Sequence, residues 1–390
     1  MKIKNIQTIA LGCDGGVVGF LRGFCLVRVE TDAGIVGYGE ASTSYGHIYP
    51  NVVEAIVDAA IAPAIMGKDP LDIRSRVHDM KLYIHPWLGW EGISAQVIGA
   101  VEIALWDILG KVKEMPICHL FGAHRDKIPL YGTGTVRPMK EGEDPKWHGK
   151  YFKELLDSGF QGIKTRISSG IEPDVAQVAA VRDYIGPGVR LMVDGYFCYT
   201  PSTAIKLAKA IAEYDIYWLE EPIPQHMLPG LARLHEESPV PIAYGERTYS
   251  LSGFEILINR RAVDILQPDV AVCGGLIECI EIDALAKAHN LKVFPHIGGL
   301  SAVGLAANLH LASIIKSEML EYDGNPYQPL RDELLKDPIF SWDRVEDGCL
   351  KVPDGPGLGI EIDESAFEKF PFKKGKFYPD VYPQFGLGYY

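Results

Sequence analysis

The 390-residue sequence has no recognisable export signal, and we find no apolar run of the length that spans a bilayer. Its first residues, MKIKNIQTIALGCDGG, contain no apolar core followed by a cleavage site of small residues. These absences predict a cytoplasmic protein that has no membrane partner.

Positive charge is scarce: 38 Lys and Arg residues stand against 51 Asp and Glu residues, and the formal net charge is -13. Because binding to nucleic acid needs a positive surface, this balance argues against a nucleic-acid partner. A small acidic substrate is still allowed, since one bound divalent cation reverses the local field. The seven cysteines include no CxxC spacing, so we expect buried, reduced thiols rather than a zinc site or a disulfide framework.

What the sequence does contain is a change of pattern near residue 125. Residues 1–125 combine two strand patterns, the second of which contains a hairpin signal at Asp32–Gly34, with long periodic helices, which predicts an α+β domain. Residues 126–323 alternate helices with eight short strands: IPLYGTG, GIKTRIS, RLMVDGY, YWLEEP, PIAYGER, VDILQPD, LKVFPHI and EMLEYD. This alternation predicts a parallel (β/α)8 barrel. Residues 324–390 are expected to be strand and loop that pack back on the first domain.

Most of these strands end in a polar residue, where a buried strand would prefer Val or Ile. Asp194, Glu220 and Glu246 end three successive strands at a constant spacing of 26 residues. Three adjacent carboxylates repel one another unless a hard cation lies between them, and oxygen ligands with open positions suit Mg²⁺. Any one of these residues would more simply cap the following helix, but their common phase predicts a Mg²⁺ site.

Two later strand ends carry a candidate proton-transfer pair. His296 follows Pro295 one repeat after Asp269. A single histidine is more often structural, but an aspartate on the adjacent strand would fix its tautomer and raise the basicity of its other nitrogen. Adjacent side chains on a strand alternate, so in WLEEP the phase selects Glu220 as the inward carboxylate. Glu221 then points outward or pairs with a neighbouring strand.

The strand GIKTRIS places two cations, Lys164 and Arg166, on the same face. A guanidinium keeps its proton up to a pH of about 12, so Arg166 is a poor base but a good fixed donor to carboxylates. Burial and the neighbouring cation would lower the pKa of Lys164 toward that of a base. Alternatively, the pair only balances the surrounding acidic residues.

In this order, the motifs resemble those of the enolase superfamily, in its mandelate racemase subgroup. The resemblance covers essentially the whole chain: KxR in the position of the family's KxK, then VDGY, WLEEP, YGE, QPD, PHIGG, LEYD and GPGLGIE. Any one motif is weak, but together they are very specific. The resemblance implies a TIM-type barrel covered by an N-terminal α+β capping domain, which the C-terminal segment completes.

The resemblance also implies a role for each site residue. The implied Mg²⁺ ligands are Asp194, Glu220 and Glu246, the implied dyad is Asp269 and His296, and the implied partners of the substrate carboxylate are Lys164 and Glu321. Glu318 lies near Glu321, but LEYD matches the family at Glu321. The shared chemistry is removal of the proton α to a carboxylate, which gives an enediolate.

Arg166 stands where members that invert a stereocentre carry their second base. The sequence therefore favours a one-base reaction, in which His296 removes the α-proton and then assists loss of the 3-hydroxyl. This is syn dehydration of a sugar acid, an aldonate or aldarate, to a 2-keto-3-deoxy acid. A cycloisomerase or lactonizing enzyme and a racemase or epimerase are the alternatives. A barrel that only binds a ligand is disfavoured, because the metal carboxylates and the dyad are all present.

Family members close the capping domain over the barrel mouth, and the matching loops here are residues 12–23 and 43–50. The candidate substrate contacts in this domain are Arg22, Tyr45, His47 and Trp90, and for each of them a packing role is an equal alternative. Arg22 is the one strongly cationic residue in these loops, which weakly favours aldonates over aldarates. Relatives of this family are usually homo-oligomers, so we expect an assembly between a dimer and an octamer.

Overall fold

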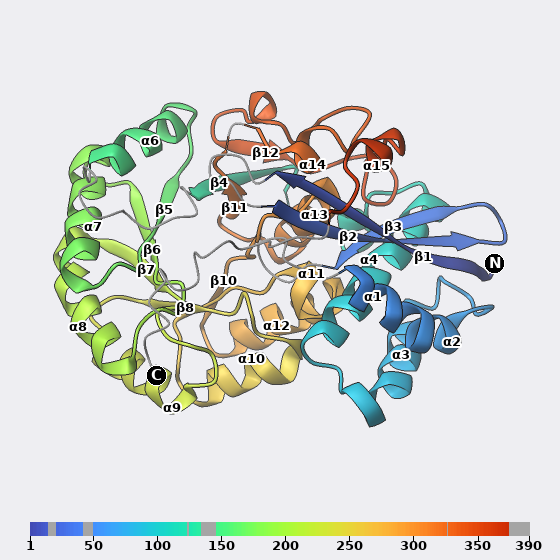
Figure 1. The fold of residues 1–390 in the computed structure, drawn as a ribbon, viewed down its shortest axis with the longest axis horizontal. Helices are drawn as coiled ribbons and strands as arrows, with labels where there is room; N and C mark the ends of the chain where they lie inside the picture. The colour runs from blue at the N-terminus through green and yellow to red at the C-terminus, as the bar shows by residue number, and fades with distance from the viewer. Residues whose placement is uncertain (15–20, 42–49, 123–124, 134–145, 326, 374–390) are drawn as a thin grey trace.

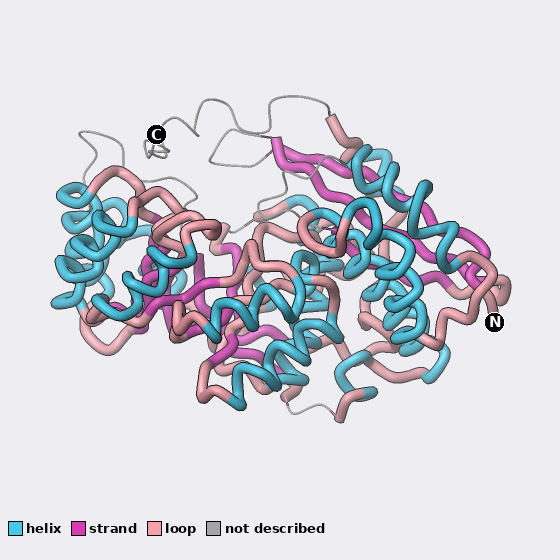
Figure 2. The backbone as a smooth tube through the Cα atoms, turned by 90° about the horizontal axis from the view of Figure 1, so that it is seen from below, coloured by secondary structure: helices cyan, strands magenta, loops and turns pink. Residues whose placement is uncertain are grey.

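The computed structural model describes residues 1–14, 21–41, 50–122, 125–133, 146–325 and 327–373. The chain begins with an antiparallel sheet of β1 (Ile3–Asp14), β2 (Leu21–Thr31) and β3 (Val36–Ala41), in that order. The predicted hairpin turn joins β2 to β3. Beside the sheet lie α1 (Pro50–Ile56), η2 (Val57–Ile61), α2 (Ala62–Ile65), α3 (Ile73–Leu88) and α4 (Ile93–Lys113), followed by α5 (Ile117–Leu120) (Figures 1 and 2).

Helix α4 packs unusually close to β3, because β3 presents two glycines to it. A Cβ atom on Gly39 would lie 1.8 Å from the carbonyl oxygen of Ala100. A Cβ atom on Gly37 would lie 2.1 Å from the carbonyl oxygen of Ala104. No side chain fits at either position, so the two glycines set the distance between helix and sheet.

We predict that Gly39→Ala destabilises the protein by about 3 kcal/mol, because α4 must move away from β3 to admit the methyl group. Equilibrium unfolding in urea measures the loss. Gly253→Ala in helix α10 (Ser250–Asn259) is the matched control, since a Cβ atom there would meet a side-chain methyl group, that of Thr248 at 3.0 Å, and not the backbone of a neighbouring element. Alanine has the higher helix propensity, so this control is expected to be neutral or stabilising. Equal stability of the two variants would contradict the packing argument.

Helix α4 also corrects one expectation from the sequence. By length and composition it could cross a membrane, and it is the one such helix in the described residues. However, 83% of its apolar window is buried inside the protein. The burial identifies α4 as the core helix of the capping domain.

Eight parallel strands form the barrel: β4 (Lys127–Thr133), β5 (Gly162–Arg166), β6 (Arg190–Asp194), β7 (Ile216–Glu220), β8 (Ile242–Tyr244), β9 (Ile265–Leu266), β10 (Lys292–Val293) and β11 (Leu320–Asp323). Each of β4 to β9 pairs with the next strand along the chain, and β11 pairs with β4. The connecting helices are α6 (Lys146–Asp157), α7 (Ile171–Ile185), α8 (Pro201–Ile211) with η3 (Ala212–Tyr214), α9 (Leu228–Glu237), α10, α11 (Val270–Cys273), α12 (Leu276–Ala288) and α13 (Ala302–Ile315). Figure 1 shows α6 to α9 outside the strands. The predicted (β/α)8 fold is confirmed.

The sheet curls until side chains from most of its strands meet inside it. One buried cluster contains Tyr131, Met192, Trp218, Ala243, Ile265, Phe294 and Met319, which come from β4, β6, β7, β8, β9 and the segments beside β10 and β11. Side chains also join β10 to β11: Lys292 Nζ lies 2.8 Å from Glu318 Oε1, and Ser317 Oγ donates to the Val293 carbonyl at 3.4 Å. The interior is filled, so any reaction takes place at the strand ends.

The C-terminal segment comprises α14 (Pro329–Asp332), η4 (Trp342–Arg344), β12 (Cys349–Lys351) and α15 (Ser365–Lys369). Strand β12 pairs with β4 in antiparallel orientation. The segment then returns to the capping domain, where Leu358 N donates to Asp107 Oδ1 at 2.8 Å and Gly12 N donates to the Phe370 carbonyl at 3.0 Å. It therefore contacts both parts of the fold, and the domain limits at 125/126 and 323/324 stay predictions.

All seven cysteines lie in the described residues, and each is a free thiol. Five are buried, whereas Cys198 and Cys349 are partly exposed. The sulfurs of Cys273 and Cys279 lie 3.1 Å apart within the core. The expectation of reduced thiols therefore agrees with the structure, but burial holds for only five of them.

Candidate active site

The carboxyl ends of the barrel strands bring the predicted polar residues into one buried space. Five of them lie at or just after a strand end, and the sixth, Glu321, lies within its strand: Asp194 (β6), Glu220 (β7), Glu246 (β8), Asp269 (β9), His296 (β10) and Glu321 (β11). Each is at most 2% exposed. Glu318, the rival of Glu321, lies at the opposite end of β11 and pairs with Lys292. The common phase of the strand ends therefore does correspond to a common place in the fold.

Three of these groups lie close enough together to share one metal ion. One oxygen of Glu220, one oxygen of Glu246 and one ring nitrogen of His296 all lie within 4.8 Å of one another. Asp194, the third predicted ligand, instead accepts a hydrogen bond from Arg166 Nε at 2.8 Å. Glu220 and Glu246 are thus adjacent as expected, with His296 beside them.

Side-chain cations compensate the carboxylates in this arrangement. Lys164 Nζ lies 2.8 Å from Glu321 Oε1 and also pairs with Glu220, while Arg247 pairs with Glu246. Two donors hold the other oxygen of Glu220: Trp218 Nε1 at 3.0 Å and Gln267 Nε2 at 2.7 Å. Glu220 therefore has a fixed orientation before any ion binds.

The electrostatics of Glu220 fit a divalent cation. The pKa of its carboxyl is raised to about 7, chiefly by burial. The charge of Lys164 lowers this pKa, and the negative charges of Asp194, Glu321 and Glu246 raise it. A cation among these oxygens would remove the repulsion, and buried carboxylate oxygens are the hard ligands that Mg²⁺ prefers. The residues present therefore suit Mg²⁺.

His296 is held by acidic groups on both ring nitrogens. Its Nδ1 lies 3.2 Å from Asp269 Oδ2, and its Nε2 lies 2.8 Å from Glu246 Oε2 and 3.8 Å from Glu321 Oε2. Burial lowers the pKa of the imidazole, but the charges of Glu246 and Glu321 and the bonds to Asp269 and Glu246 raise it well above its ordinary value. The ring is thus poised to hold a proton at the centre of the cluster.

Backbone and side-chain donors fix the second member of this pair. Asp269 Oδ1 accepts from Ala271 N at 2.9 Å and from Asn308 Nδ2 at 3.3 Å, and Oδ2 accepts from Gly298 N at 3.4 Å. The carboxylate that faces His296 therefore cannot turn away without breaking these bonds. Such a partner fixes which ring nitrogen carries the proton.

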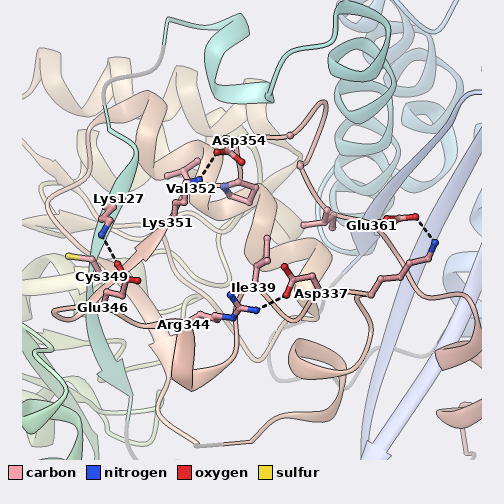
Figure 3. A pocket seen from close by; sticks show the side chains of 15 residues that line it. Lys127, Asp337, Ile339, Arg344, Glu346, Cys349, Lys351, Val352, Asp354 and Glu361 are labelled. Atoms are coloured by element: carbon pink, nitrogen blue, oxygen red, sulfur yellow. Dashed lines mark hydrogen bonds and ion pairs between the residues drawn. The ribbon is translucent and has the colours of Figure 1, made fainter.

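A cavity of about 620 Å³ lies at the other end of the barrel, between the start of β4 and the C-terminal segment (Figure 3). Its cations pair with acidic residues of its own wall: Lys127 with Glu346, Lys336 with Glu361, Arg344 with Asp337 and Lys351 with Asp354. Lys127, which lines the cavity, begins β4, whereas Thr133 ends β4 on the rim where the site lies. The cavity is therefore separate from the site.

Comparison with known proteins gives a consistent result. The model of the enolase C-terminal domain-like family matches residues 149–366, and that of the mandelate racemase / muconate lactonizing enzyme N-terminal domain matches residues 21–122. The chain belongs to the mandelate racemase/muconate lactonizing enzyme family. It is 34% identical to an arabinonate dehydratase of Saccharolobus solfataricus, over 95% of this chain and 100% of that protein.

Two further members of the family are informative. A D-galactarolactone cycloisomerase of Agrobacterium fabrum is 33% identical, over 90% of this chain and 91% of that protein. A racemase from Streptomyces coelicolor, solved with bound magnesium, superposes with a TM-score of 0.83 at 26% identity, over 94% of this chain and 99% of that one. The family therefore includes both dehydratases and isomerases.

The KxR pair of this family member lies side by side, as the strand geometry predicted. Lys164 contacts Glu220 and Glu321, while Arg166 contacts Asp194 and packs 4.9 Å from the centre of the Tyr196 ring. The expected lowering of the Lys164 pKa is wrong for this arrangement. Burial does lower it, but the carboxylates of Glu220 and Glu321 outweigh burial and raise the pKa well above its ordinary value.

Arg247 is a site residue that we did not single out from the sequence. It pairs with Glu246 and Glu221, and its guanidinium lies 4.4 Å from the ring centre of Phe197 and 5.3 Å from that of Tyr196. Both aromatic residues adopt left-handed backbone angles, with φ of 48° and 47°, which concentrate at functional sites. The signal in the sequence was the arginine directly after Glu246 in YGER. Glu221, as one of our two alternatives stated, pairs with a residue beside the neighbouring strand.

The structure places two of the four predicted capping-domain contacts, and they lie in different surroundings. Arg22 is 5% exposed, and its Nη1 lies 3.2 Å from Asp323 Oδ2 at the end of β11, so it lies close to the barrel mouth. Trp90 is 37% exposed and stacks on His85, with ring centres 4.3 Å apart. Tyr45 and His47 lie outside the described residues.

Proposed function

We propose that this protein removes the proton α to the carboxylate of a sugar acid, with Mg²⁺ as cofactor, and dehydrates the acid to a 2-keto-3-deoxy acid. The arrangement of His296 supports this most: Asp269 holds one ring nitrogen, and the other faces the carboxylate cluster, 2.8 Å from Glu246. A histidine fixed in this way presents one nitrogen to a substrate that lies over the cluster.

Mg²⁺, held by Glu220, Glu246 and an Asp194 carboxylate that would share its charge between the ion and Arg166, would supply positive charge to the substrate carboxylate as negative charge develops on it. Lys164, positioned by Glu220 and Glu321, donates to the same carboxylate. Glu321 accepts from Lys164 here, and its pKa is lowered because Lys164 and His296 outweigh burial. A role as donor to the substrate would first require a proton on Glu321.

His296 then carries out both proton transfers of the elimination. Its Nε2, which faces Glu246 here, must be unprotonated to take the C2 proton. The electron pair of the C2–H bond first moves into the carboxylate as an enediolate, and it then forms the C2=C3 double bond as the C3–O bond breaks. The imidazolium returns the proton to the departing hydroxyl, which leaves as water. The resulting enol becomes the 2-keto acid when C3 is protonated. Because one group serves both bonds, they break on the same face.

The alternative from a second class is cycloisomerisation, which the similarity to the D-galactarolactone cycloisomerase supports. Both reactions begin with removal of the α-proton, so they share the site residues described above. They differ in the substrate: a cycloisomerase acts on a ring-closed acid, whereas the dehydratase acts on an open-chain acid. Racemisation is disfavoured, because Arg166 replaces the second base and cannot readily give up its proton.

Screening open-chain aldonic and aldaric acids with Mg²⁺ in D₂O tests this proposal. We expect at least one acid to give a 2-keto product, detected as its semicarbazone. The unreacted acid should show no epimer at C2 by NMR, because protonation from the second face lacks a base. If none of these acids reacts but their lactones, screened in parallel, are consumed, cycloisomerisation is favoured. Accumulation of the C2 epimer would contradict the one-base reaction.

A further inference from the structure

A buried glutamate of the capping domain caps a helix of the barrel. Glu40, near the end of β3, is 1% exposed. Its oxygens accept from Ser301 N at 3.1 and 3.2 Å, from Ser301 Oγ at 2.6 Å and from Gly304 N at 2.9 Å. These donors form the start of α13, where free backbone N–H groups and the helix dipole both favour an anion. The capping domain is thus hydrogen-bonded to the N-terminus of one barrel helix.

Helix α13 is connected to both members of the His296–Asp269 pair. Ser301, which caps the helix, follows His296 by five residues, so its position limits the loop that carries the imidazole. Further along the helix, Asn308 Nδ2 lies 3.3 Å from Asp269 Oδ1, and Asn308 Oδ1 lies 3.4 Å from Val270 N. A shift of α13 would therefore disturb His296 and Asp269 together.

The contact between Glu40 and α13 leaves little room for adjustment. A Cβ atom on Gly304 would lie 2.8 Å from Glu40 Oε2, so the helix approaches this closely only because glycine occupies the position. The Glu40 carboxylate is the acceptor in each of these hydrogen bonds. An uncharged amide in its place would turn an NH₂ group toward a donor, since an amide has only one acceptor oxygen.

We propose that Glu40 is a positioning residue for the reaction: by capping α13, it holds the His296–Asp269 pair in the geometry that proton transfer needs. This inference rests on the proposed function of the pair. It assigns the capping domain a second role, because one of its buried side chains sets the place of the base from outside the barrel.

Glu102 supplies a matched control. It lies on α4, is fully buried and accepts from Leu276 N at 2.8 Å and Ile277 N at 3.0 Å, so it caps barrel helix α12 in the same way. Its third donor is Trp106 Nε1 at 2.7 Å. Helix α12 begins seven residues after Asp269, beyond α11, whereas α13 begins six residues after His296 and also bonds to Asp269 through Asn308. Glu40→Gln and Glu102→Gln therefore remove the same kind of contact from two different helices.

Steady-state kinetics on the acid found in the screen, well below the melting temperature of each variant, test the proposal. Glu40→Gln is expected to lower kcat between about 10-fold and 100-fold while KM stays within about twofold, since a small misplacement of a catalytic group has effects of this size. Glu102→Gln should lower the melting temperature comparably and leave kcat near that of the wild type. Equal losses of kcat in the two variants, or unchanged kcat in Glu40→Gln, would overturn the proposal.

Hydrogen exchange of the substrate-free protein, followed by mass spectrometry, separates this proposal from the proposed function. If no acid is turned over by the wild type, the function fails and exchange alone decides the role of Glu40. We expect Glu40→Gln to accelerate exchange in residues 294–301 and 268–273, and Glu102→Gln to do so only near residues 274–280. If Glu40→Gln accelerated exchange in α13 but left it unchanged in residues 294–300 and 268–273, Glu40 would only stabilise its helix.

Discussion

His296→Asn is expected to lower kcat about 10⁴-fold, at the upper end of what one general acid–base group contributes, because the same imidazole serves both proton transfers. Asparagine keeps a polar group near Asp269 but cannot take up a proton near neutral pH. Loss of the C2 proton to D₂O should stop together with formation of the 2-keto acid. The two readouts distinguish a missing base from a defect confined to the later loss of water.

His235→Asn is the matched control for this experiment. His235 also pairs with an aspartate, since its Nε2 lies 3.0 Å from Asp264 Oδ1. That pair lies at the opposite end of the barrel, where Asp264 directly precedes β9. The same substitution there should change kcat by less than about twofold. Full turnover by His296→Asn would refute the mechanism, and an equal loss in both variants would mean that the effect is structural.

The part of the site that the sequence predicted is the part that the strand period determines. Each strand–helix repeat delivers the end of its strand to the same rim, so residues in phase, such as Glu220 and Glu246, meet whatever the outer helices contain. The alternation of side chains likewise separated Glu220 from Glu221. The same period also predicted the barrel itself, because eight such repeats close on themselves.

The remaining features depend on contacts between distant residues or on side-chain choices that a period does not determine. Glu40 and Ser301 are 261 positions apart, and a glutamate at the end of a strand gives no sign of the helix that it caps. Asp194 is in phase with Glu220, yet its carboxylate pairs with Arg166, and His296 takes the adjoining place. Helix α4 is one of the periodic helices expected in residues 1–125, but it was not expected to be apolar enough to cross a membrane, because its few charged residues interrupt the apolar run.

Glu220→Gln should abolish turnover and reduce the stabilisation of the protein by Mg²⁺ to less than half. In the wild type, a cation relieves the repulsion among buried carboxylates, and an ion present at about 100 times its Kd stabilises the native state by about 2.7 kcal/mol. The variant lacks one of three proposed ligands, so it should gain less than half of that free energy at the same Mg²⁺ concentration. Equilibrium unfolding in urea with and without Mg²⁺ measures this difference, and calorimetric titration measures binding of the ion directly.

Glu221→Gln provides the comparison, because Glu221 is the adjacent residue, is equally buried at 1% exposure and differs mainly in where it points. Its carboxylate faces Arg247, which keeps Glu246 as a partner when Glu221 is replaced. This variant should therefore retain the response to Mg²⁺. If both variants lost the response, the charge of the region rather than the direction of Glu220 would govern binding of the ion. If both kept it, the carboxylate at the end of β7 would not be a ligand. The reaction would then need another source of positive charge at the substrate carboxylate, and Lys164, beside Glu220 and Glu321, would be the candidate.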